Sequence, residues 1–140
     1  LALLMALPCQ AAELVACHDG DTCRFDVDGR TVKVRLWGMD APELAQPRGV
    51  EARDHLVALL RSGPLALECY GKSWDRKTCA VAVGGRDVGR DMVRAGYAWD
   101  SPRYSRGKYA AAQRAARAEK AGLWADADPT SPYCWRGPKR

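Results

Sequence analysis

Four charged residues that lie close together in the sequence have side chains suited to chemistry: Asp21, Arg35, Asp40 and Glu43. Two short carboxylates that converge on one point, as Asp21 and Asp40 could, form the hard-oxygen site that Ca²⁺ or Mg²⁺ prefers. An arginine beside such a site can clamp a phosphate group with two N–H donors. A carboxylate on a loop, as we expect for Glu43, can take a proton from an attacking water.

Each of these residues also has an ordinary structural explanation. Aspartate is common in turns because its side chain hydrogen-bonds the local backbone. Arg35 could be a solvated strand residue or the partner of Glu43 in an ion pair, and Glu43 could be a cap or a loop charge. These explanations give no reason for the four residues to occur together, so the site hypothesis is favoured.

A β-hairpin is predicted to carry most of these residues. Two alternating runs, Thr22–Val27 and Thr31–Trp37, are joined by Asp28-Gly29, which is a strong hairpin signal. Successive side chains of a strand point to opposite faces, so Arg35 lies on the face away from its apolar neighbours Val32, Val34 and Leu36. One face can therefore pack a core while Arg35 points towards the acidic turns that precede and follow the hairpin.

The rest of the chain is predicted to complete a small antiparallel barrel. Periodicity predicts strands at Leu14–Cys17, Leu65–Cys69 and Cys79–Val83, helices at Val50–Arg61, Asp87–Ala95 and Tyr104–Ala121, and an extended piece at Tyr97–Trp99. Five short strands, with helices after the third and at the end, favour a single barrel domain with helices.

The composition excludes a disordered chain. Charged residues make up 28% and hydrophobic residues 47% of the 140 residues, which is typical of a globular domain with a sizeable core. The net charge of +5 suits a polyanion, because basic side chains release counterions from phosphates. Many basic exported proteins bind no polyanion, so charge alone leaves both interpretations open.

Both ends of the chain are predicted to lie outside the domain. Residues 1–12 have a short apolar run, a proline and then small residues, which indicates a secretory signal remnant cleaved near Ala11 or Ala12. The alternative is a buried N-terminal strand. We expect a domain at residues 13–126, a Pro-rich basic tail at 127–140, a periplasmic or secreted protein, and no membrane segment after signal removal.

Six cysteines in a short exported chain suggest disulfides. Two pairs flank short loops and are placed to bridge hairpins: Cys17 with Cys23, and Cys69 with Cys79. Cys134 would then be left with Cys9, which could be lost with the signal. A metal site is the competing hypothesis, but the sequence has no Cys-x-x-Cys and only two histidines.

Three segments resemble the staphylococcal nuclease (thermonuclease) family: DGDT at Asp19–Thr22, VRLWGMDAPE at Val34–Glu43 and QPRGVEAR at Gln46–Arg53. Later pieces agree, and the likeness covers roughly Leu14 to Trp124. The resemblance implies a five-stranded OB-fold β-barrel with helices and Ca²⁺-dependent cleavage of phosphodiester bonds in DNA and RNA. Single strands should be favoured because an OB groove suits unpaired bases. We expect a monomer with no stable protein partner.

The resemblance also implies roles for the residues that match these motifs. Asp21 and Asp40 would be the Ca²⁺ carboxylates. The backbone carbonyl of Ala41 would be a further ligand, at a place where the family often has threonine. Arg35 would hold the scissile phosphate, and Glu43 would orient or deprotonate the attacking water.

The family's second arginine is where this chain departs from the pattern. The family has Asp-x-Tyr-Gly-Arg before a strand, whereas this chain has KSWDRK at Lys72–Lys77. Arg76 takes the arginine place, and we prefer it because a planar guanidinium suits the charge that grows on phosphate oxygens. A one-residue shift gives Lys77 instead. Trp74 could stack a base, and Tyr104 is a further candidate for stacking or packing.

Two hypotheses from other classes remain. A non-catalytic nucleic-acid-binding module of the same OB fold would keep the barrel and the basic surface, and the altered Lys72–Lys77 loop leaves room for it. A secreted structural or inhibitory protein held by disulfides would carry its basic charge incidentally.

Overall fold

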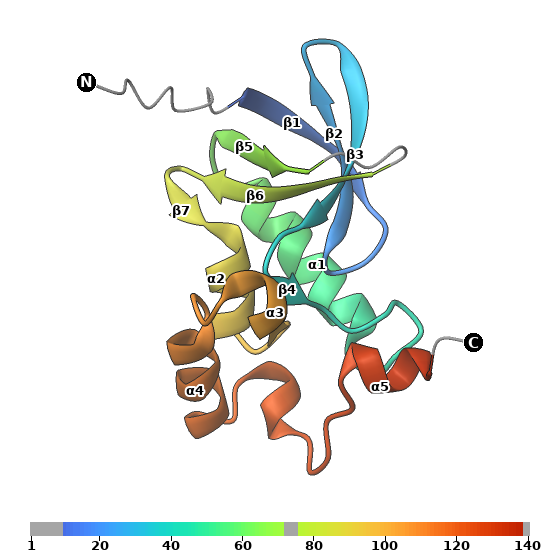
Figure 1. The fold of residues 1–140 in the computed structure, drawn as a ribbon, viewed down its shortest axis with the longest axis vertical. Coiled ribbons are helices and arrows are strands. Elements are labelled where there is room, and N and C mark those ends of the chain that lie inside the picture. The colour runs from blue at the N-terminus through green and yellow to red at the C-terminus, as the bar shows by residue number, and fades with distance from the viewer. Residues whose placement is uncertain (1–9, 72–75, 139–140) are drawn as a thin grey trace.

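A closed five-stranded β-barrel with helices forms the centre of the molecule, as predicted (Figure 1). The computed structural model describes residues 10–71 and 76–138. The barrel strands are β1 (Gln10–Cys17), β2 (Thr22–Val27), β3 (Arg30–Leu36), β5 (Leu65–Tyr70) and β6 (Lys77–Val83). They lie in the order β3-β2-β1-β5-β6 with antiparallel neighbours, and a parallel pairing of β3 with β6 closes the barrel. The OB-fold prediction is therefore confirmed.

The predicted hairpin forms with the predicted alternation of side chains. Thr22 lies opposite Arg35 in the β2–β3 register, and Val27 lies opposite Arg30. Asp28 and Gly29 both have positive φ, as a tight two-residue hairpin turn requires. Val34 is fully buried while Arg35 is partly exposed, so Arg35 faces away from the barrel core.

Strand β1 begins earlier than the sequence pattern indicates. Residues 10–12, which we assigned to the signal remnant, pair with β5, where Ala11 lies opposite Ala66 and Ala12 opposite Leu65. Residues 1–9 lie outside the described part of the chain. Within that described part, no helix has the length and apolar character needed to cross a membrane.

Two helices pack close to their predicted positions. Helix α1 (Gly49–Leu60) buries Ala52, Leu56 and Leu60, and helix α2 (Val88–Arg94) follows the short strand β7 (Arg86–Asp87). The Asp87 side chain caps α2 by accepting a hydrogen bond from the backbone N–H of Arg90.

The prediction of a single helix at Tyr104–Ala121 is wrong. The chain forms two shorter helices there, α3 (Pro102–Ser105) and α4 (Ala110–Ala118). Arg106 and Gly107 between them have φ of 53° and 85°, and left-handed residues cannot continue a right-handed helix. The break lets Tyr109 turn into the core, where its hydroxyl donates to the Asp87 carboxylate at 2.9 Å, so packing is the role of Tyr109.

Both predicted disulfides are confirmed. Cys17 and Cys23 face each other across β1 and β2, and Cys69 and Cys79 face each other across β5 and β6. The exposed Cys134 has no disulfide partner among the described residues, and Cys9 lies outside them. Each disulfide closes a loop that carries a predicted site residue, Asp21 in the first and Arg76 in the second.

The segment predicted as a basic tail, residues 127–140, contains helix α5 (Pro132–Arg136). A 3₁₀ turn at Gly122–Ala125 precedes this segment, at the end of the predicted domain. In Figure 1 the red helix α5 lies apart from α4, close to the loop that leads from β4 (Met39–Asp40) to α1. The C-terminal segment thus returns to the region of the predicted site.

Candidate active site

The Asp19–Thr22 turn places Asp21 at the start of β2. Asp19 Oδ1 accepts hydrogen bonds from the backbone N–H groups of Asp21 (3.1 Å) and Thr22 (2.9 Å), so Asp19 stabilises the turn itself. Gly20 is needed because a Cβ there would lie 2.7 Å from the Ala41 Cβ. The turn therefore packs tightly against the Asp40–Glu43 segment.

Asp21 is a buried carboxylate, only 5% exposed. Its Oδ2 accepts a hydrogen bond from the backbone N–H of Ala41 (2.8 Å), and its Oδ1 accepts one from the Thr22 hydroxyl (3.1 Å). Burial raises the pKa of Asp21 to about 7, with Arg35 acting in the opposite direction and Asp19 adding to the rise. A cation beside Asp21 would favour its ionised form.

Arg35 joins the two predicted metal carboxylates. Its Nη1 lies 2.9 Å from Asp21 Oδ2, and its Nη2 donates to Asp40 Oδ1 at 3.0 Å. The contact between Nη1 and Asp21 is an ion pair without hydrogen-bond geometry. This buried nitrogen therefore has no hydrogen-bond partner among the described residues. Arg35 therefore holds the carboxylates of Asp21 and Asp40 together through one guanidinium.

A short strand pair fixes Asp40. Strand β4 pairs with β8 (Trp99–Asp100), with Met39 opposite Asp100 and Asp40 opposite Trp99. The predicted extended piece near Trp99 thus supplies the partner of the segment that carries Asp40. The pairing holds the Asp40 carboxylate beside Arg35.

The Glu43 loop is held against the start of α1. The Glu43 N–H donates to the side-chain oxygen of the buried Gln46 (3.1 Å), and the Gln46 N–H donates to the Glu43 carbonyl (2.9 Å). A Cβ on Gly49 would overlap the Glu43 carbonyl oxygen, so only glycine allows this close approach. The Glu43 carboxylate is left partly exposed beside Asp40.

Replacing Gly49 by Ala is expected to push the Glu43 loop away from α1. The added methyl group meets backbone and not a flexible side chain, so we expect a loss of about 1–3 kcal/mol in the free energy of unfolding. Urea unfolding measures this loss. Gly63→Ala is the matched control, because a Cβ there would have its nearest neighbour at 3.6 Å. Equal stability of the two variants would contradict this account of Gly49.

The structure does not bring every predicted site residue to the carboxylates. Arg76 and Lys77 are exposed at the start of β6, and among the described residues no ion pair joins either to Asp21, Asp40 or Glu43. Tyr104 is exposed on α3 beneath the Arg103 guanidinium. Trp74 lies outside the described residues.

A second arginine at the carboxylates, missed by the sequence analysis, comes from α5. Arg136 Nη1 donates to Glu43 Oε1 (2.7 Å), and its Nη2 donates to Asp40 Oδ2 (2.9 Å). It lies 93 residues beyond Glu43 in a segment without a recognised motif, so no local signal in the sequence could have revealed it.

The side chains at this site have the oxygen ligands that a divalent cation prefers, but they do not form a dense cluster of ligands. Within the described residues, no group of three or more His, Cys, Asp and Glu side chains is arranged to hold a metal ion. Asp21 and Asp40 nevertheless offer hard carboxylate oxygens on the two sides of Arg35, and the buried Asp21 gains from a nearby positive charge. Two carboxylates, a backbone carbonyl and waters would fit Ca²⁺.

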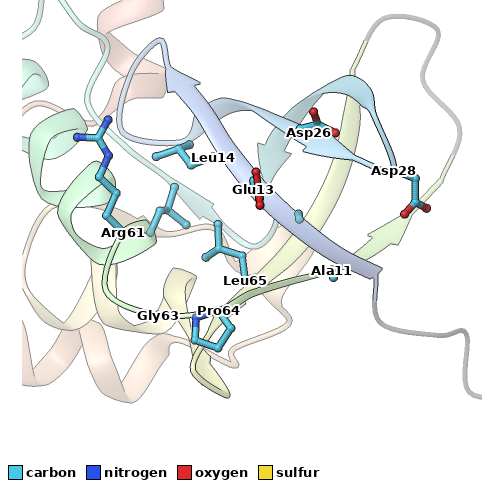
Figure 2. Close-up of a pocket in the computed structure, with 11 residues that line it drawn as sticks. Ala11, Glu13, Leu14, Asp26, Asp28, Arg61, Gly63, Pro64 and Leu65 are labelled. Atoms are coloured by element: carbon cyan, nitrogen blue, oxygen red, sulfur yellow. The ribbon is translucent and has the colours of Figure 1, made fainter.

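A surface hollow of about 680 Å³ lies elsewhere on the molecule. It runs between β1, the β2–β3 hairpin and the end of α1, and Figure 2 shows the carboxylates of Glu13, Asp26 and Asp28 around it. None of the predicted site residues lines it. Three carboxylates against the single Arg61 make it unsuitable for a polyanion.

The class of this protein follows from its fold and its site. The fold is a closed OB barrel, and two arginines and three carboxylates meet beside its β2–β3 hairpin. The family model for staphylococcal nuclease homologues matches residues 33–126. An uncharacterized endonuclease of Haemophilus influenzae is 36% identical over 126 residues, which cover 88% of this chain and 71% of the relative. A similarly named protein of Escherichia coli O157:H7 is 35% identical over 121 residues, covering 84% and 79%.

This chain belongs to the staphylococcal nuclease family. It is also 31% identical over 141 residues to a probable staphylococcal-like nuclease of rice, named CAN2. That match covers 99% of this chain but only 37% of the rice protein, so the chain spans little more than a third of that relative.

Proposed function

We propose that this chain is a Ca²⁺-dependent nuclease that hydrolyses phosphodiester bonds of DNA and RNA and favours single strands. The observation that carries the proposal is the ion-pair network in which Arg35 joins Asp21 to Asp40 and Arg136 joins Asp40 to Glu43. The endonuclease names of the bacterial relatives support the same activity. The two disulfides support the proposal that the protein acts outside the cytoplasm. We also propose that it acts as a monomer.

In the proposed mechanism the chain's own residues bind the substrate and move a proton. Arg35, whose side chain is partly exposed, binds the scissile phosphate, and Arg76 or Lys77 binds the substrate further along the strand. Glu43 orients a water and accepts its proton as the water oxygen attacks phosphorus and the bond to the 5′ oxygen breaks. When bound by Asp21, Asp40 and the Ala41 carbonyl, Ca²⁺ would offset negative charge on the phosphate.

Cleavage of a labelled single-stranded DNA oligonucleotide tests this proposal. We expect hydrolysis in Ca²⁺, no hydrolysis in EDTA, and full recovery when Ca²⁺ is added back. The second candidate, a non-catalytic binding module, is favoured by the absence of Arg76 and Lys77 from the carboxylate cluster. Metal-independent, salt-sensitive binding without cleavage would support that module and overturn the nuclease.

A further inference from the structure

The C-terminal segment is anchored beside the Glu43 loop by several specific contacts. Arg48 forms a two-point ion pair with Asp126, at 2.7 Å and 2.9 Å. The Gln46 side chain, whose oxygen accepts from the Glu43 N–H, donates through its nitrogen to the Thr130 carbonyl. Pro132 at the start of α5 is buried. The same loop thus positions both Glu43 and the segment that carries Arg136.

Helix α5 is positioned so that its last residue, Arg136, contacts the carboxylates of Asp40 and Glu43. The Ser131 side chain caps the helix by accepting from the Cys134 N–H at 3.2 Å. Arg136 then contacts both oxygens of Asp40, at 3.4 Å and 2.9 Å, and one oxygen of Glu43 at 2.7 Å. Arg35 contacts Asp40 as well, so the two guanidiniums share one carboxylate.

Arg136 adds positive charge to a site that is rich in carboxylates. The two guanidiniums contact Asp21, Asp40 and Glu43, and the buried Asp19 lies next to Asp21. Without Arg136, a single guanidinium would face these carboxylates. A phosphodiester is an anion, so the second guanidinium favours its approach. The Arg136 side chain is 45% exposed, so its guanidinium can reach a ligand that arrives from solvent.

We propose that Arg136 is a second phosphate-binding arginine of this active site, supplied by the C-terminal helix in addition to Arg35. The proposal rests on the nuclease function proposed above and deepens it. Arg136 donates to the carboxylates while the site is empty of substrate and donates to a phosphate oxygen when a nucleic acid is bound. The exposed Tyr133 and Trp135 on the same helix provide ring faces for bases next to that phosphate.

Two variants at Arg136 and one control test the proposal. We expect Arg136→Ala to lower kcat/KM on single-stranded DNA about 100-fold, and Arg136→Lys to lower it less, because ammonium keeps the charge but loses the planar pair of donors. Arg114→Ala on α4 is the matched control. It removes the same charge from an exposed side chain with no ion pair among the described residues, so kcat/KM should change less than twofold.

Calorimetry with thymidine 3′-phosphate in Ca²⁺ provides a readout that does not depend on cleavage. This monoester carries a phosphate group but no diester bond, so we expect Arg136→Ala to weaken its binding about 10- to 100-fold and Arg114→Ala to leave it unchanged. Circular dichroism confirms that each variant is folded.

The possible results separate this inference from the proposed nuclease function. If the wild-type chain cleaves DNA and Arg136→Ala cleaves it equally well or faster, Arg136 only covers the carboxylates and the inference is overturned. If the wild-type chain does not cleave DNA, the nuclease proposal fails. Calorimetry still decides then: weaker binding by Arg136→Ala supports a phosphate-binding role, and equal or absent binding in both proteins overturns it.

Discussion

Glu43→Gln is expected to lower kcat on single-stranded DNA by about 10³-fold, within the range that a general base contributes. The amide keeps the size of the side chain but cannot accept a proton from water. The Gln46 and Gly49 contacts that hold the Glu43 loop involve its backbone, so the loop should stay in place. KM should therefore change little, and steady-state kinetics in Ca²⁺ separate the two parameters.

Glu13→Gln is the matched control for Glu43→Gln. It makes the same chemical change on an exposed face of β1, and Glu13 lines the hollow away from the site. We expect wild-type kinetics from this variant. If the kcat of Glu43→Gln stays within tenfold of the wild-type value, Glu43 is not the general base.

Arg35→Ala is expected to damage both activity and stability. Arg35 contacts Asp21 and Asp40, so its loss removes the proposed phosphate donor and leaves the buried Asp21 without its cation. We expect kcat/KM to fall about 10³-fold. We also expect the free energy of unfolding to fall by about 1–3 kcal/mol, because Asp21 and Asp40 lose the cation that both contact. Nuclease kinetics and urea unfolding measure the two effects.

Lys33→Ala on the same strand separates a specific effect from general loss of positive charge. Lys33 precedes Arg35 by two residues on the same face of β3, it is exposed, and no ion pair joins it to a described residue. We expect its stability to match wild type and its kcat/KM to fall less than threefold. A similar loss in both variants would mean that Arg35 acts only through net charge.

Local patterns predicted the hairpin and its charged residues well. The Asp28-Gly29 turn and the alternation around Arg35 are short-range features, and the structure shows both. Each disulfide joins two cysteines that face each other across neighbouring strands. The position of these cysteines on either side of a short loop was therefore enough to predict the pairing. The family motifs added the closed barrel, which short-range patterns alone only suggested.

Contacts between distant residues account for what the sequence did not reveal. Asp40 is held by a strand around Trp99, and Glu43 by an arginine 93 residues later, and neither pairing has a local signal. The break between α3 and α4 has the same origin. Arg106-Gly107 takes a left-handed conformation where Tyr109 must turn into the core, and helix propensity alone favoured a continuous helix.

The order in which the site residues appear along the chain has a consequence for synthesis on the ribosome. The hairpin that carries Asp21 and Arg35 emerges early, but its closing partner β6 begins only at Lys77 and the strand that holds Asp40 begins at Trp99. A growing chain shorter than this carries the charged residues without the framework that aligns them. The site is therefore assembled only after most of the chain has been made.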